Sequence, residues 1–460
     1  MGIANLFPVT PASGFLPDLI YTGEKFESNL ALCTEHGIIT RFSRDPADLA
    51  RATRLPHQAI VPGFVNVHSH AFQRVIRGRT ETRTSDRDTF WTWRVSMYHA
   101  ANRVSPEAMF HVARMAFCEM ALSGITTVGE FHYVHHAEGG RPYPDRNLLA
   151  KQILKAAEDI GIRIALLRTA YVRAGWNKAP DPGQSRFITP RAGDFIADTE
   201  TLRAALPPRA TVGVAPHSVR AVPLDYLRQV AAYAQSHHLP LHMHVSEQPA
   251  EVEAALGEYG LRPVELLHRE GILDERFTAI HAIHITPQEA GYLGGSTVCA
   301  CPTSERNLGD GAVPADLLYN AGAQICFGSD SNVQIDILED ARLLEYDLRM
   351  NQLQRVILSP SDDLSKRLFR SATASGAASL ALNTGILAPG RRADFISVDL
   401  HDPSLAGADA GSLLDHLVFS LERTAIRTVW VDAEPIIRDG RHRLQDEIVQ
   451  QFTAVQRSLW

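Results

Sequence analysis

The sequence has few cysteines and no long apolar run. Its 460 residues include five cysteines, with no CxxC spacing among them, so a disulfide framework is not expected. No apolar stretch reaches the roughly 18 residues that a membrane-spanning helix requires. The opening segment MGIANLFPVTPASG lacks the basic stretch and apolar core of a secretion signal. We therefore expect a reduced, cytoplasmic protein.

The sequence also lacks an excess of positive charge. Its 45 Lys and Arg against 52 Asp and Glu give a net charge of −7. Such a balance leaves no basic footprint for nucleic acid or an anionic membrane, so small molecules are the expected partners. At 45% hydrophobic and 21% charged residues, the composition is that of a globular protein with room for one large domain and a small one.

Eight short strand-like runs, each followed by a longer segment with helical spacing, occupy residues 61–387. The runs are AIVPGFVNVHSH, TTVGEFHYVHH, RIALLRTAYVRAG, TVGVAPHSVR, LPLHMHVSEQ, FTAIHAIHIT, STVCACPTSERN and AQICFGSDSNV. This number and alternation predict an α/β fold with a closed (β/α)₈ barrel of the TIM type. The polar stretch at 175–194 is expected to be a long loop that covers the site.

The two flanks of the predicted barrel have a different pattern. Residues 1–60 and 388–460 hold short strand candidates such as HGIIT, ADFISVDL and IRTVWVD, separated by Gly, Pro and Asp turns. We expect the two flanks to form one small β-sandwich domain together.

Two histidines one residue apart end the first run. In a strand, residues i and i+2 point to the same face, so His68 and His70 can both face the barrel axis while Ser69 points away. An HxH pair alone is also compatible with an exposed strand edge. It indicates a metal site only if further ligands lie nearby.

Further ligand-type residues end other runs of the predicted barrel. His244 ends LPLHMH, His281 ends FTAIH and Asp330 ends ICFGSD. Functional residues of such barrels gather at the C-terminal ends of the strands, so these side chains should meet. A catalytic zinc needs a few nitrogen or oxygen ligands and one open position for water. The predicted ligands are His68, His70, His244 and Asp330.

Two side chains near this set are left for proton transfer. Glu247, three residues after His244, can act as a general acid/base, or it can be the carboxylate at the start of a helix PAEVEAAL. His281 can polarise the scissile group or move a proton, with Asp330 assisting, or it can be a core histidine. His242 shares the face of His244 and is expected to support the ligands.

The order of these motifs resembles the amidohydrolase superfamily over nearly the whole chain. The features are HxH on the first strand, a His with Glu three residues later, a His on the sixth strand, GSDS on the eighth, and the C-terminal GAASLALNTGILAPGRRADFISVD. Two-metal members use a carboxylated lysine on strand four, where this sequence has His217. The sequence therefore resembles the one-metal, deaminating branch, which implies one Zn²⁺ per chain, with iron as the alternative metal.

Within that branch, six segments in order resemble the deiminases that act on formimidoylglutamate in histidine degradation. They are NVHSHAFQR, FWTWR, EFHYVHH, PHSVR, HVSEQ and CPTSERNLGDG. The resemblance implies a homodimer, and it implies five substrate contacts: Gln73, Arg94, Tyr133, His217 and Arg220.

The implied contacts suit a substrate with two carboxylates, because an arginine pairs with a carboxylate through two parallel hydrogen bonds. Arg94 can also be a surface arginine on an aromatic helix, and Tyr133 can be a hydrogen-bonded core phenol. The SER within CPTSERNLGDG places Arg306 near the site, with its direction open.

Three functions compete at this point. The first is hydrolytic deimination, in which water attacks the formimino carbon of formimidoylglutamate and ammonia leaves. The second keeps this chemistry but acts on a heterocycle such as guanine, cytosine or a triazine, which has no need of two arginines. The third is a binding or assembly protein without turnover, which has no use for a complete ligand set beside an unused Glu and His.

Overall fold

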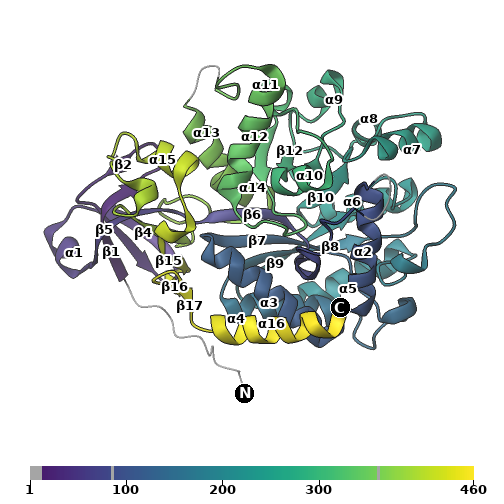
Figure 1. Cartoon of the computed structure of the whole chain (residues 1–460), viewed down its shortest axis with the longest axis horizontal. Coiled ribbons are helices and arrows are strands. Elements are labelled where there is room, and N and C mark those ends of the chain that lie inside the picture. The colour runs from purple at the N-terminus through teal and green to yellow at the C-terminus, as the bar shows by residue number, and fades with distance from the viewer. Residues whose placement is uncertain (1–12, 84–87, 360–362) are drawn as a thin grey trace.

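The computed structural model describes residues 13–83, 88–359 and 363–460. Residues 1–12, on which the expectation of no secretion signal largely rests, lie outside this part. Figure 1 shows a smaller sheet built from both ends of the chain beside a larger set of strands surrounded by helices. Within the described ranges, no helix is both long enough and apolar enough to span a membrane.

The larger part is a barrel of eight parallel strands that follow one another in chain order. The strands are β6 (Phe64–Ser69), β7 (Ile125–His132), β8 (Arg163–Ala170), β9 (Ala210–Pro216), β10 (Leu241–Val245), β11 (Phe277–His281), β12 (Thr297–Ala300) and β13 (Gln324–Phe327). Each predicted run overlaps one of these strands, and β7 and β9 begin one residue before their runs. The predicted fold class is confirmed.

The first and last barrel strands meet at their C-terminal ends. Ser69 and Asp330 form an isolated parallel bridge. The N–H of His70 donates to the carbonyl of Asp330 at 2.9 Å, and the N–H of Asp330 donates to the carbonyl of His68 at 2.9 Å. The backbone closure of the barrel therefore brings together the residues of two predicted ligand segments.

Helices connect the barrel strands and cover the outside of the barrel (Figure 1). They are α2 (Phe90–Arg103), α3 (Pro106–Leu122), α4 (Leu148–Ile160), α5 (Ala192–Arg203), α6 (Leu224–Ser236), α7 (Pro249–Tyr259), α8 (Pro263–Arg269), α9 (Pro287–Tyr292), α10 (Pro302–Leu308), α11 (Ala315–Asn320) and α12 (Ile337–Gln352). In α4, Leu149, Ile153 and Ile160 recur at helical spacing and are buried. The helix ends at Gly161, whose φ of 87° lies in the left-handed region that favours glycine.

The second sheet is mixed and combines the two ends of the chain. Its strands are β1 (Ser13–Tyr21), β2 (Phe26–Glu27), β3 (Ala31–Glu35), β4 (Ile38–Ser43), β5 (Thr53–Pro62), β14 (Phe395–Asp399), β15 (Ile426–Val431), β16 (Glu434–Arg438) and β17 (Arg441–His442). Strands β5 and β14 pair directly. Only Gly63 separates β5 from β6, and a Cβ there would lie 2.2 Å from the side chain of Thr126. A glycine is therefore required where the chain enters the barrel.

The remaining helices include α1 (Pro46–Arg51), α13 (Leu364–Arg370), α14 (Gly376–Ser379), α15 (Leu413–Ser420) and α16 (Gln445–Leu459). The last of these differs from the expected grouping of 388–460 with the β-rich domain. Figure 1 shows α16 running alongside α3 and α4 of the barrel. Arg114 of α3 pairs with Glu447 at 3.0 Å, and the side chain of Gln456 donates to the carbonyl of Val75 at 2.8 Å. The end of the chain thus packs on the barrel.

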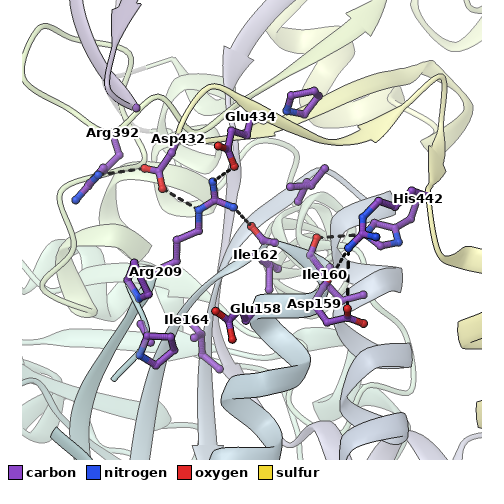
Figure 2. Close-up of a pocket in the computed structure, with 18 of the residues that line it drawn as sticks. Glu158, Asp159, Ile160, Ile162, Ile164, Arg209, Arg392, Asp432, Glu434 and His442 are labelled. Carbon is purple, nitrogen blue, oxygen red and sulfur yellow. Dashed lines mark hydrogen bonds and ion pairs between the residues drawn. The ribbon is translucent and has the colours of Figure 1, made fainter. Parts of the chain in front are cut away.

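Ion pairs join the second sheet to the N-terminal end of the barrel. Arg163, at the start of β8, pairs with Asp394 at 2.7 Å and with Asp432 at 2.6 Å. Arg209, just before β9, pairs with Asp432 at 2.8 Å and with Glu434 at 2.6 Å (Figure 2). These contacts bind the starts of two barrel strands to the turn between β15 and β16.

A cavity of about 1000 Å³ lies beside these ion pairs. Figure 2 shows it between the barrel and the second sheet, with Ile160, Ile162 and Ile164 among its lining residues. It is at the strand starts, whereas catalytic residues of such barrels lie at the strand ends. The described residues include two clusters of potential metal ligands, and no residue of either cluster lines this cavity. This cavity is therefore not the candidate active site.

Candidate active site

Four predicted ligands converge at the C-terminal end of the barrel. His68 is in β6, His70 directly follows β6, His244 is in β10 and Asp330 follows β13. Their potential ligand atoms all lie within 4.8 Å of one another, and all four residues are buried. The Nε2 atoms of His68 and His70 are each 3.3 Å from Oδ1 of Asp330. The structure therefore brings together the whole predicted set.

Hydrogen bonds orient two of the imidazoles. Nδ1 of His70 lies 2.9 Å from the carbonyl of Phe131, and Nδ1 of His244 lies 3.1 Å from the carbonyl of His217. A carbonyl only accepts, so Nδ1 carries the proton in both rings and Nε2 keeps its lone pair. Backbone contacts of this kind are how proteins fix the tautomer of metal-binding histidines.

The donor set fits a divalent metal ion. Both nitrogens of the fully buried His68 ring lack a hydrogen-bond partner among the described residues, and such buried polar atoms call for a missing partner. Burial lowers the pKa of His68 to about 3 and also lowers the pKa of His70 and His244. Burial alone would raise the pKa of Asp330, but the close contact with His68 and the nearby His70 and His281 lower it. Neutral imidazoles and a carboxylate are ligands that zinc prefers.

Strained backbone positions surround this cluster. Ser246, His281 and Asp330 have φ values of 52°, 72° and 45°, in the left-handed region where each non-glycine residue costs about 1–3 kcal/mol. Neighbouring strands hold these turns, because the N–H of Ala282 donates to the carbonyl of Val245 at 3.0 Å and Asp330 is held by β6. The strained turns are therefore held in place next to the ligand cluster by the barrel backbone.

Glu247 and His281 lie beside the ligand cluster without belonging to it. Nε2 of His281 is 3.7 Å from Oε1 of Glu247. Burial raises the pKa of Glu247. Burial alone would lower the pKa of His281, but Glu247 and a hydrogen bond to Glu305 raise it to about 10. Both groups can therefore hold or release a proton next to the ligands.

Glu247 lies just ahead of helix α7 without capping it. Helix α7 begins at Pro249 and its N-cap is Gln248, which makes no side-chain cap. Glu247 precedes the helix, and its side chain lines the hollow above the ligands. It is therefore not the capping carboxylate of α7.

The five expected substrate contacts line the same hollow: Gln73, Arg94, Tyr133, His217 and Arg220. The amide of Gln73 donates to the hydroxyl of Tyr133 at 2.9 Å. Arg94, on α2, stacks over the ring of Trp91 and hydrogen-bonds the hydroxyl of Tyr98. Arg220 is 9% exposed, and its Nη1 has no hydrogen-bond partner in the described part of the chain.

The hollow is narrow. Its volume is about 40 Å³, room for about three water molecules at roughly 10–15 Å³ each. Aromatic residues supply much of its wall: Phe90, Trp93, Tyr98, Tyr133, Tyr171 and Phe187. Phe187 belongs to the loop at 175–194 that was expected to cover the site. A larger ligand enters only when some of these side chains move.

Two tyrosines of the site were missed in the sequence. Gln184, in the covering loop, donates to the hydroxyl of Tyr98 at 2.6 Å and to that of Tyr171 at 2.9 Å. Tyr98 is four residues after Arg94, on the same face of a helix, and Tyr171 directly follows β8. Both positions could therefore have marked these tyrosines as candidate site residues in the sequence.

Two other expectations are resolved near the site. Arg306 points outward, where it bonds Gln334 at 2.6 Å and pairs with Glu339 at 3.5 Å. Its neighbour Glu305 points inward, and Oε1 of Glu305 lies 3.0 Å from Nδ1 of His281. Nε2 of His242 hydrogen-bonds the carbonyl of Ser379 at 3.0 Å, so this contact does not support a ligand.

The fold and the ligand cluster are those of a metal-dependent hydrolase, and the chain belongs to the amidohydrolase family, which it matches over residues 59–436. It is similar to formimidoylglutamate deiminase of Pseudomonas aeruginosa, at 37% identity over 403 residues, covering 86% of this chain and 88% of that protein. A 5-methylthioadenosine/S-adenosylhomocysteine deaminase of Natronomonas pharaonis is 26% identical over 84% of this chain and 83% of that protein. The chain is thus a hydrolase that acts on C–N bonds.

Solved structures agree with this assignment. An amidohydrolase of Brucella melitensis has 33% identity and a TM-score of 0.89, covering 98% of this chain and 100% of the other. An adenosine deaminase of Xanthomonas campestris with bound zinc has a TM-score of 0.80 at 21% identity, covering 98% and 99%. At that identity, the second likeness shows the fold alone.

Proposed function

We propose that this enzyme hydrolyses N-formimidoyl-L-glutamate to N-formyl-L-glutamate and ammonia, as a step in histidine degradation. The observation that carries the proposal is that Arg220 is buried in the hollow while its Nη1 has no hydrogen-bond partner within the described residues. The guanidinium interacts with the hydroxyl of Tyr171 and with the charge of Glu251. Its Nη1 is left to donate to a substrate carboxylate, which would form a charge-assisted hydrogen bond there.

Arg94 supplies a second cation in the same hollow, where it stacks over the ring of Trp91 and hydrogen-bonds the hydroxyl of Tyr98. We propose that the two arginines bind the two carboxylates of the substrate. Its formimino end then lies over the ligand cluster. The similarity to formimidoylglutamate deiminase supports this choice of substrate.

The ligands His68, His70, His244 and Asp330 would hold one Zn²⁺ ion, which would lower the pKa of a water molecule and make it a better nucleophile. Glu247 accepts a proton from the attacking water and passes it to the terminal nitrogen of the substrate. His281, whose Nε2 is 3.7 Å from the carboxylate of Glu247, shares this proton and stabilises the developing charge. Asp330 assists the transfer.

The bonds balance as follows. The water oxygen bonds to the formimino carbon as the C=N double bond becomes single, and one water proton goes to the terminal nitrogen. The new hydroxyl group then loses its proton to the same nitrogen, the C=O bond of the formyl group forms, and the bond from the carbon to the terminal nitrogen breaks. Ammonia leaves with both protons of the water. The bond from the carbon to the glutamate nitrogen stays intact because the arginines hold that end away from the acid. The product is N-formyl-L-glutamate.

The test is ammonia release from a panel of formimino amino acids, guanine and cytosine by the purified, metal-loaded enzyme. Formimidoylglutamate should be the preferred substrate, because only a substrate with two carboxylates uses both arginines. Preference for guanine or cytosine would contradict the proposal and indicate heterocycle deamination. The aromatic side chains of the hollow would then explain the binding of a ring.

We further propose that the enzyme is a cytoplasmic homodimer. All five cysteines lie in the described ranges, and all are buried and unpaired, which suits a reducing compartment. Val95, on the same helix as Arg94, is a 67% exposed apolar side chain that a second copy could cover. Light scattering from the purified protein tests the dimer.

A further inference from the structure

The carboxylate of Glu305 lies behind the ring of His281. Helix α10 begins two residues after the end of β12, and Glu305 lies in its first turn. The side chain contacts His281 at the end of β11 and is 2% exposed. Its Oε1 atom is 3.0 Å from Nδ1 of His281 and 2.9 Å from the backbone nitrogen of Cys301. The backbone nitrogen can only donate, so it fixes this oxygen as an acceptor facing the imidazole.

The two nitrogens of His281 therefore have different surroundings. Nδ1 faces the oxygen of Glu305, whereas Nε2 has no hydrogen-bond partner in the described part of the chain and faces Glu247 at 3.7 Å. A ring with one nitrogen held and the other open presents the open nitrogen to whatever occupies the hollow.

A purely structural role explains less of this geometry. The N–H of Cys301 alone could satisfy a buried carboxylate from many side-chain rotamers. The observed one places the same oxygen on both the N–H of Cys301 and the ring of His281. Burying a carboxylate is costly unless it is paired, and the imidazole is its only ion-pair partner in the described ranges.

We propose that Glu305 is a positioning residue that holds the ring of His281 with Nδ1–H towards itself and Nε2 towards the reacting atoms. Its effect on turnover rests on the proposed function. The hydrogen bond between Glu305 and His281 does not depend on the proposed function. An experiment can therefore contradict one of the two proposals and leave the other in place.

Three variants of the full-length, metal-loaded enzyme test the proposal. Glu305→Met removes the acceptor at similar size, Glu305→Gln keeps an oxygen that the N–H of Cys301 still orients, and Arg306→Gln changes the exposed neighbour on the same helix. With formimidoylglutamate, Glu305→Met should lose about 10²-fold in kcat while KM changes little. Glu305→Gln should recover most of that loss, and Arg306→Gln should match the parent.

A spectroscopic readout does not depend on the substrate. In protein labelled with ¹⁵N-histidine, the hydrogen-bonded Nδ1–H of His281 should give a proton NMR signal far downfield, assigned by its loss in His281→Asn. The signal should persist in Arg306→Gln and Glu305→Gln and disappear in Glu305→Met. If Glu305→Met does not fold, a shift of the signal in Glu305→Gln still supports the contact, and an unshifted signal contradicts it.

The outcomes separate the two proposals. A parent that is inactive on formimidoylglutamate but shows the Glu305-dependent signal would overturn the substrate and leave the contact with His281. A folded Glu305→Met variant that keeps the signal, or that turns over at the parental kcat, would overturn the role of Glu305. Equal losses in Glu305→Gln and Glu305→Met with unchanged NMR signals would also overturn it.

Discussion

The backbones of His70 and Asp330 are joined directly: the N–H of His70 donates to the carbonyl of Asp330 at 2.9 Å. The side chains of the same two residues lie 3.3 Å apart, from Nε2 to Oδ1. The contact that closes the barrel between β6 and β13 thus lies directly beside the side chains of two predicted metal ligands. A metal ion held by these side chains would therefore also tie the first barrel strand to the last.

Asp330→Asn should reduce metal affinity, because an amide is a weaker ligand than a carboxylate. We expect one equivalent of metal per parent chain by elemental analysis and well under one in the variant after dialysis. Metal loading should also raise the melting temperature of the parent more than that of the variant. Two equivalents in the parent would contradict a one-metal site.

Glu247→Gln should keep the metal and lose turnover. The amide preserves the shape of the side chain but cannot accept the proton from water, so kcat should fall by about 10² or more. Metal content should match that of the parent, since Glu247 is outside the ligand cluster. Near-parental kcat would show that Glu247 does not transfer the proton.

Arg220→Met should mainly damage substrate recognition. An unpaired substrate carboxylate in a closed site forfeits about 2–5 kcal/mol, which appears as a large fall in kcat/KM. Arg306→Met is the matched control, because Arg306 is exposed and points away from the hollow. Parental kcat/KM in Arg220→Met would show that the carboxylate binds elsewhere.

Asp394→Asn should destabilise the junction between the second sheet and the barrel. Burial alone would raise the pKa of Asp394, but its ion pair and hydrogen bonds with Arg163 hold it below the ordinary value of about 3.9. The carboxylate therefore stabilises the fold above about pH 4, and this contribution is lost as the pH falls through the folded-state pKa. Breaking such a buried pair costs about 3–5 kcal/mol.

Thermal melting at several pH values checks this effect. The variant should melt well below the parent at pH 7, and the difference should shrink in acid. Asp439→Asn, at an exposed ion pair with Arg427, should change little. A difference between parent and Asp394→Asn that is the same at pH 3 and pH 7 would refute the assigned pKa shift.

Much of the site could be predicted because its residues follow strands with clear patterns. The alternation of His68 and His70 after a buried run, and the strand-end positions of His244 and Asp330, depend on local sequence alone. The assignment of Glu305 could not be made this way. Whether Glu305 or Arg306 points inward depends on how the short helix α10 sits against β11, which is a tertiary contact.

The docking of α16 was missed for a similar reason. Its sequence shows an amphipathic helix, but its partner surface lies on α3, more than three hundred residues earlier in the chain, through contacts such as Glu447 with Arg114. Amphipathic spacing shows that one face is buried and leaves the covering element undetermined. Tyr98 and Tyr171 could have been found in the sequence, because Tyr98 lies four residues after Arg94 and Tyr171 directly follows β8.

The most direct test of the account is proton NMR of the reaction of formimidoylglutamate with the metal-loaded enzyme. The substrate can be cleaved at either of two C–N bonds, and the proposal that Arg94 and Arg220 bind the carboxylates while Glu247 protonates the terminal nitrogen decides between them. The account predicts N-formyl-L-glutamate with an equal amount of ammonia. Formamide with free glutamate would contradict it, because the acid would then have protonated the nitrogen held by the arginines.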